Sequence, residues 1–235
     1  MLYLSQHGIE AIANMALRDY ARHNLSCTYL PIDIDDFAKT YLGLRLKYTQ
    51  LSSDGSILGL TTYKDVQVEL TLGNRKIVIA VEEDTILLND GLYMPQHSKL
   101  RRFTIAHECS HQILGRIMRH DSRKDFKTDR LYSCRDLKNA QAWSERLANA
   151  LGAAILMPKL DLLRMLRGFN PTKFTMYGNR FNPMDYRQIK DLSDRYEVSF
   201  TAMALRLKEL GFIERKHACE YHDPRDIFPD EAACL

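Results

Sequence analysis

The chain has 235 residues, which is enough for one large domain or for one domain with a small appendage. Its hydrophobic fraction of 45% and charged fraction of 27% are typical of soluble globular proteins, and no apolar run is long enough to span a bilayer. A net charge of +3 is too small to indicate nucleic-acid binding by itself. These properties exclude a membrane-spanning or disordered chain and leave a folded domain.

The cysteines and the start of the chain indicate a reducing compartment. Five cysteines are scattered without a CxxC pair, and an odd number argues against a disulfide framework. Residues 1–7 lack the basic start and the apolar core of a signal peptide. We therefore expect a cytoplasmic protein.

The first third of the chain predicts a helix, a short helix and then strands. Apolar spacing favours a helix over 8–23 and a second one from Ile34 to Leu42, with Asp33 or Asp35 as its cap and Gly43 at its end. Short β-like runs follow at 44–48, 56–62, 66–72, 76–81 and 85–88, separated by turn residues. They predict a small, mainly antiparallel sheet made of hairpins.

After Pro95 the pattern becomes helical, and this helix carries His107 and His111 with Glu108 between them. Residues four apart lie one turn above the other on the same helix face, so both imidazoles can reach one metal ion. Glu108 lies about 100° round from His107, close enough to contact a water without binding the ion. HExxH is therefore the minimal set for holding zinc and activating water, although two ordinary half-buried histidines would show the same spacing.

The rest of that helix favours the zinc interpretation. Ile105, Cys109 and Ile113 form a second apolar stripe opposite the histidines, which is typical of an interior helix. Burying two imidazoles and a carboxylate there costs several kcal/mol unless a cation compensates. Cys109 lies about 200° from either histidine, so we expect its thiol to point into the core.

The second half of the chain predicts helices joined by polar connections. Residues 119–140 are dense in charge and predict an exposed connection, 141–157 a helix ended by Pro158, and 168–183 a long loop. Two helices follow at about 185–196 and 200–210, closed by Gly211. We expect a metallopeptidase domain over 1–183, a helical segment packed on it over 184–215, and a flexible tail over 216–235.

A catalytic zinc needs a third protein ligand, and spacing leaves several candidates open. The extended motif with a third histidine fails, because Leu114 and Ile117 occupy its glycine and histidine positions. Glu145 begins a helix face of small residues that could pack closely on the HExxH helix, although a glutamate there could also simply complement the helix dipole. Further candidates lie in the charged connection: His120, Asp121, Asp125, Asp129 and Asp136.

Three blocks in order resemble the ImmA/IrrE family of bacterial zinc metallopeptidases. They are RRFTIAHECSHQILG at 101–115, ExxAN at 145–149 followed by ILMP at 155–158, and VSFTAMALRLKELG at 198–211. The chain departs from the family pattern at Ser110, where glycine is usual, and at Leu151-Gly152, where Phe-Ala is usual.

The resemblance implies an α+β, zincin-like metallopeptidase with an HExxH active-site helix and a C-terminal helix-turn-helix-like segment. It implies that His107, His111 and Glu145 bind Zn²⁺ and that Glu108 is the catalytic carboxylate. It also implies a protein substrate, a cognate helix-turn-helix repressor of a mobile element or stress system.

Two further roles depend on the same architecture. Asn149 is a candidate partner that orients Glu145, or it is only a helix–helix contact. An edge strand before the active helix typically aligns the substrate, and the run best placed for this is Thr85, Ile86, Leu87, Leu88 and Asn89.

Two other functions remain as alternatives. Residues 186–211 have the spacing of a helix-turn-helix, which would place Thr201, Arg206 and Lys208 near DNA. Their second helix is not notably basic, so direct DNA contact is not favoured. A zinc-bound sensor without turnover is the other alternative, but it would have no use for Glu108.

Overall fold

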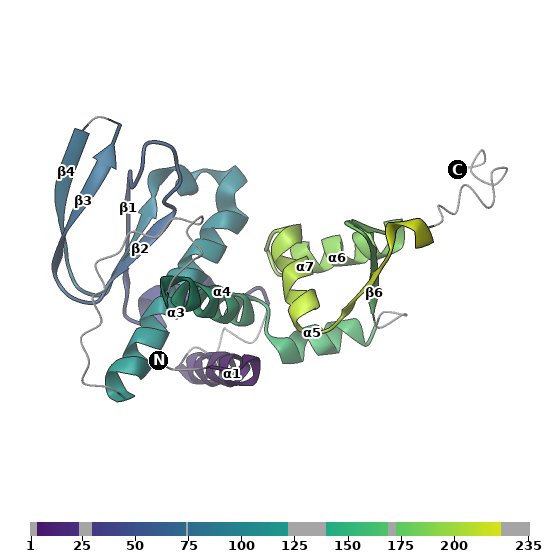
Figure 1. Cartoon of the computed structure of the whole chain (residues 1–235). Coiled ribbons are helices and arrows are strands. Elements are labelled where there is room, and N and C mark those ends of the chain that lie inside the picture. The colour runs from purple at the N-terminus through teal and green to yellow at the C-terminus, as the bar shows by residue number, and fades with distance from the viewer. Residues whose placement is uncertain (1–3, 24–29, 74, 122–139, 169–172, 222–235) are drawn as a thin grey trace.

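The computed structural model describes residues 4–23, 30–73, 75–121, 140–168 and 173–221 (Figure 1). The helices are α1 (Gln6–His23), α2 (Ile34–Asp36), α3 (Ser98–Asp121), α4 (Ala140–Leu156), α5 (Lys159–Leu166), α6 (Pro183–Arg195) and α7 (Phe200–Glu209). Single turns of π or 3-10 helix are η2 (Phe37–Tyr41), η3 (Asp90–Tyr93), η4 (Pro95–His97) and η5 (Ala218–Glu220). The strands are β1 (Arg45–Thr49), β2 (Gly59–Thr62), β3 (Val66–Leu72), β4 (Arg75–Val81), β5 (Thr85–Asn89), β6 (Phe174–Tyr177), β7 (Arg180–Phe181) and β8 (Ile213–Lys216).

The α+β class is confirmed, but the first five strands do not form one sheet of hairpins. They form a three-stranded sheet in the order β1-β5-β2 and a separate β3–β4 hairpin. β1 pairs with β5 in parallel, while β2 pairs with β5 antiparallel. The hairpin packs on one face of the sheet through a cluster that includes Leu60, Leu87 and Val68, and Ile86 and Leu88 belong to the core cluster that contains residues of α3.

The prediction that Thr85–Asn89 is an edge strand is wrong. These residues form β5, which lies between β1 and β2, so both of its backbone edges are paired. All five residues are buried, and a continuous buried run is typical of a central strand. Within the part of the chain that the structure describes, β2 pairs with β5 alone and is an edge of this sheet.

The predicted start and end of the short second helix are confirmed. Asp33 caps it by accepting a hydrogen bond from the Asp36 backbone N–H. Gly43 follows it with φ +70°, a conformation that costs glycine nothing.

The HExxH helix is an interior helix, as its two apolar stripes predict. Ile105, Ala106 and Cys109 on α3 are fully buried. The Cys109 thiol lies in the core and burial raises its pKa, so it behaves as a small hydrophobic side chain. α4 packs along α3 and α1 packs along α4, which places the start of the chain next to the central helices (Figure 1).

The second half holds more regular structure than the sequence indicated. Residues 159–166 form α5, and the predicted loop at 168–183 contains β6 and β7. These strands make a small sheet in the order β7-β6-β8, whose last strand follows α7. The strands are only two to four residues long, too short for an alternating pattern to be visible. This sheet joins residues on both sides of the expected boundary at 183/184, which stays a prediction.

Residues 216–221, the first part of the expected flexible tail, are among the described residues and hold contacts with the fold. β8 includes residues 213–216, and Tyr221 packs edge-on against the Tyr177 ring at a centroid distance of 5.3 Å. Residues 222–235 lie outside the described residues.

The C-terminal helices pack on the N-terminal part of the chain. Ile189, Leu192 and Leu207 belong to the same hydrophobic cluster as Ile9 and Ile105. Figure 1 places α6, α7 and β6 at the opposite end of the molecule from the β3–β4 hairpin. No helix among the described residues is both long and apolar enough to cross a membrane.

Arg206 does not lie where a DNA-reading residue would. Its side chain is 2% exposed and makes a two-pronged ion pair with Glu10 on α1. Its Nε also donates to the Met157 carbonyl oxygen. Arg206 is therefore not available to contact DNA in this fold, and the DNA-binding alternative itself stays untested.

Candidate metal centre

The two histidines of α3 point the same ring atoms toward one another. His107 Nε2 and His111 Nε2 lie 3.1 Å apart, and the ring planes are inclined by 81°. The side chains are 13% and 4% exposed, respectively. One helical turn between them places both nitrogens beside the same point, as the i, i+4 spacing predicts.

Glu145 reaches this point from α4. Its Oε2 lies 3.2 Å from His107 Nε2 and its Oε1 lies 3.2 Å from His111 Nε2. The close approach of the helices depends on Gly152: a Cβ there would lie 3.2 Å from the Ala106 carbonyl and from the His107 nitrogen. The predicted face of small residues thus brings the glutamate to the histidines.

The three side chains form a cluster whose donor atoms all lie within 4.8 Å of one another. In a tetrahedral zinc site with bonds of about 2.0–2.1 Å, neighbouring ligand atoms lie roughly 3.3 Å apart. The observed separations of 3.1 and 3.2 Å match this spacing. Within the described part of the chain, the buried Glu145 Oε1 makes no aligned hydrogen bond despite its nearness to His111. The donor set and its spacing fit zinc.

The charges in the cluster favour an ionised carboxylate. Burial by itself would raise the pKa of Glu145. The adjacent imidazoles of His107 and His111 have the larger combined effect and lower that pKa to about 2. Burial lowers the pKa of His107, yet the carboxylates of Glu145 and Glu108 outweigh it and leave that pKa raised. A cation, whether a proton or a metal ion, is therefore stabilised at this point.

Asn149 contacts a histidine, which is neither of its two expected roles of orienting Glu145 or serving only as a helix–helix contact. Its Oδ1 lies 2.9 Å from His107 Nδ1, so the imidazole donates from Nδ1 to the amide oxygen. This hydrogen bond fixes the tautomer that leaves the Nε2 lone pair free for a metal. One turn of α4 separates Asn149 from Glu145, which explains why the two residues serve the same cluster.

Glu108 lies beside the cluster as a buried carboxyl group. It is 2% exposed, and burial is the largest cause of its raised pKa. Its buried Oε2 has no hydrogen-bond partner among the described residues. A carboxylate with a raised pKa and an oxygen without a hydrogen-bond partner among the described residues is suited to accept and return a proton.

Sequence reasoning missed the residues of β2 that lie against this carboxylate. A Cβ on Gly59 would lie 2.7 Å from Glu108 Oε1 and 2.8 Å from the Thr104 methyl group. Only glycine leaves room for Glu108 here. An isolated glycine inside the β-like run of 56–62 was the available signal, because it often marks a close approach of another group.

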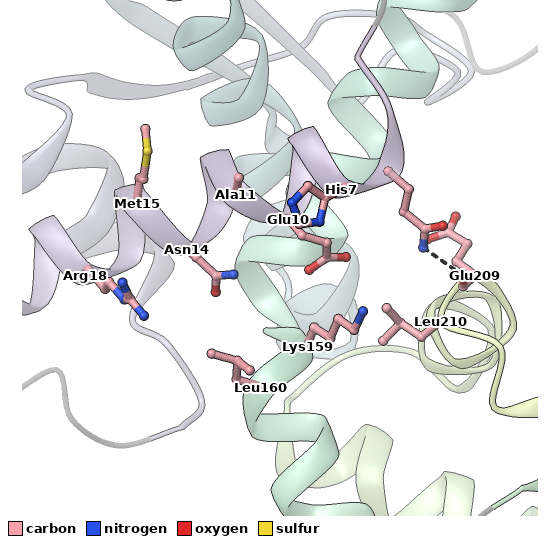
Figure 2. Close-up of a pocket in the computed structure, with 11 residues that line it drawn as sticks. His7, Glu10, Ala11, Asn14, Met15, Arg18, Lys159, Leu160, Glu209 and Leu210 are labelled. Carbon is pink, nitrogen blue, oxygen red and sulfur yellow. Dashed lines mark hydrogen bonds between the residues drawn. The ribbon is translucent and has the colours of Figure 1, made fainter.

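Two large cavities lie on other faces. One of about 610 Å³ is bounded by α1, α5 and α7, with His7, Glu10 and Lys159 in its wall (Figure 2). The other, of about 600 Å³, is lined largely by apolar side chains and reaches Asn149. The histidine–glutamate cluster is not in the wall of either cavity. We assign the chemistry to the cluster because, among the described residues, it combines converging donor atoms with a buried carboxylate.

Comparison with known proteins agrees with this geometry. The family described as the IrrE N-terminal-like domain, a peptidase family, matches residues 83–208, more than half of the chain. The chain belongs to the ImmA/IrrE family. The matched range contains α3, α4 and nearly all of α7, so it covers the first two blocks that carried the resemblance and residues 198–208 of the third. Membership points to a metallopeptidase-like function.

One curated relative is the radiation response metalloprotease IrrE of Deinococcus radiodurans. It is 28% identical over 130 residues, which cover 51% of this chain and 34% of the relative. This chain thus matches about a third of the length of that ImmA/IrrE protein.

The other candidate ligands are not tested. Asp125, Asp129 and Asp136 lie outside the described residues, as do the side chains of His120 and Asp121 at the end of α3.

Proposed function

We propose that this protein is a zinc-dependent endopeptidase in which His107, His111 and Glu145 bind the metal and Glu108 is the general base. The observation that carries the proposal is the convergence of three ligand atoms within 4.8 Å beside a buried carboxylate. A structural zinc site would have no need of that carboxylate, which disfavours a sensor without turnover.

The protein's own side chains supply orientation and proton transfer. Asn149 holds His107 through Nδ1, and Glu145 keeps a negative charge opposite the two imidazoles. Zinc bound there supplies a Lewis acid that activates water and polarises the scissile carbonyl. Glu108 accepts the proton of the attacking water at its unpartnered Oε2 and returns it to the leaving amine.

We further propose that β2, in place of β5, aligns the substrate. The Asn89 N–H donates to the Leu58 carbonyl, and hydrogen-bonded pairs alternate along an antiparallel ladder. Gly59 and Thr61 therefore direct their backbone groups away from β5. A peptide that pairs with this edge would pass directly beside Glu108.

The substrate we propose is a cognate helix-turn-helix repressor of a mobile element or stress system. Its support is family kinship. Direct DNA contact by α7 is not part of the proposal, because the Arg206 charge is already neutralised by Glu10. We place the reaction in the cytoplasm on the cysteine pattern; Cys109 and Cys219, the cysteines among the described residues, form no disulfide.

The test incubates the zinc-loaded protein with the repressor encoded beside it and compares wild type with Glu108→Gln. Loss of the base should lower the cleavage rate at least 100-fold while zinc stoichiometry stays at one. Asp161→Asn serves as the matched acid-to-amide control and should cleave at the wild-type rate. Asp161 lies on α5, where it forms a surface ion pair with Arg164. Equal cleavage by wild type and Glu108→Gln would refute the catalytic assignment.

A further inference from the structure

The segment from Gly59 to Tyr63 runs along one face of α3. Thr104, Glu108 and Gln112 are four residues apart, so they share this face. Successive contacts join the two elements in order: Thr104 and Glu108 meet Gly59, and Gln112 meets Thr61 and Thr62. Farther along, Tyr63 meets His111 and Gly115. We call this row of contacts the β2–α3 seam.

Gln112 is the polar centre of the seam. It is fully buried, and its Nε2 donates to Thr61 Oγ1 and to the Thr62 carbonyl oxygen, both at 2.8 Å. It directly follows His111 in sequence. The amide therefore connects the edge strand to the helix turn that carries a proposed metal ligand.

Tyr63 closes the far end of the seam. Its hydroxyl donates to the His111 carbonyl oxygen at 2.8 Å, and its ring lies on Gly115. A Cβ on Gly115 would lie 2.6 Å from Tyr63 Cε1. A second glycine is thus required where a side chain of the strand segment lies on the helix.

The two glycines make the seam specific for one register. Gly59 gives room on the strand for Glu108, and Gly115 gives room on the helix for Tyr63. A shift of β2 by one residue, about 3.4 Å, would place the Leu60 side chain against the Glu108 carboxylate. The hydrogen bonds of Gln112 and Tyr63 hold the strand in the one position that avoids this clash.

We infer that Gln112 and Tyr63 are positioning residues that set the register of β2, and hence of the bound peptide, against Glu108. The inference rests on the proposed peptidase function. It goes beyond that function because neither side chain belongs to the three-residue metal cluster: each acts on which peptide bond is presented. Removing the hydrogen bonds of either residue should therefore add cleavage at neighbouring peptide bonds. Simple destabilisation of the fold would lower the cleavage rate without changing which bonds are cut.

The experiment maps cleavage sites by mass spectrometry on a proteome-derived peptide library. The variants are Gln112→Met, which keeps the volume but removes both donors, and Tyr63→Phe, which removes one hydroxyl. Ser193→Ala is the control, since it removes another buried hydrogen bond, to the Lys190 carbonyl, far along the chain. Zinc affinity is measured in parallel by competition with a chelator.

For both variants we expect zinc affinity within threefold of wild type and new cuts one or two bonds from the wild-type sites. For Gln112→Met we also expect cleavage at the wild-type sites to fall about 10- to 100-fold, as for a misplacement of about 1 Å. Ser193→Ala should cut at the wild-type sites. If Gln112→Met and Tyr63→Phe cut the wild-type bonds in wild-type ratios, the inference is overturned and the proposed function stands. If the zinc-loaded wild type cuts neither this library nor the repressor encoded beside it, the proposed function fails first.

Discussion

Replacing Glu10 with glutamine would leave the Arg206 guanidinium charge buried without a carboxylate partner. In the native pair Nη1 lies 2.6 Å from Oε1 and Nη2 lies 3.0 Å from Oε2. The side chains are 2% and 9% exposed, so water cannot replace the lost charge. The pair is the most buried ionic link between α7 and α1, the first described helix of the chain.

Removing one partner of such a pair costs about 3–5 kcal/mol of unfolding free energy. With a urea slope of about 3 kcal/mol per M for a chain of this size, the unfolding midpoint should fall by about 1–1.7 M. The double variant Glu10→Leu/Arg206→Met removes both charges and keeps the volume. Its stability should lie within about 1 kcal/mol of wild type, because an apolar replacement leaves no buried charge behind.

The assay is urea unfolding followed by far-UV circular dichroism at pH 7. Lys190→Ala is the control, because it breaks an exposed i, i+4 pair with Asp194 and should cause no measurable shift. A midpoint shift below about 0.3 M for Glu10→Gln, which corresponds to about 0.9 kcal/mol at that slope, would refute the reasoning. Two separate transitions in the wild type would refute the expectation that residues 184–215 pack on the peptidase domain.

Three further outcomes concern the metal centre. Glu145→Ala should weaken zinc binding at least 100-fold by chelator competition, and unchanged affinity would move the third ligand elsewhere. In metal-free protein, the raised pKa of His107 stabilises the fold below pH 6.5, and this stabilisation is lost as the pH rises. The lowered Glu145 pKa of about 2 stabilises the fold above pH 4.5, and this stabilisation is lost as the pH falls toward 2. Thermal melts should therefore show the largest stabilisation by these two groups between pH 4.5 and 6.5. Zinc binding displaces the proton, so zinc affinity should instead increase as pH rises. A zinc affinity that followed the same pH profile as the melting temperature would contradict this. Gly59→Ala should lower turnover at least tenfold with zinc retained, while Gly91→Ala, whose Cβ would meet only one side-chain oxygen at 3.4 Å, should not.

Local patterns predicted the parts of the fold that depend on neighbouring residues. The i, i+4 spacing of His107 and His111 brings their nitrogens together through helix geometry alone. The burial of Cys109 follows from its angular position on the same helix. The small face of α4 indicated close helix packing, and the contact of Gly152 with α3 bears this out.

Strand pairing was harder to predict because partners far apart in sequence compete for each strand. The five residues of β5 are compatible with an edge strand or a central strand. Its pairing with both β1 and β2 shows that it is the central strand. From the sequence, Asn149 could have contacted Glu145 or only a neighbouring helix. The packing of α4 on α3 brings its amide oxygen to His107 instead.

The sequence by itself determined that two imidazoles and a carboxylate share one helix, while its spacing left the second carboxylate, Glu145, among several candidates. It did so because ligand spacing within a helix is set by a fixed repeat of 3.6 residues. Only the tertiary structure decided that Gly59 lies against Glu108, that Arg206 is buried in an ion pair with Glu10, and that Gln112 joins α3 to β2. Those features depend on contacts between residues more than 40 positions apart, and such contacts leave no periodic signal in a single sequence.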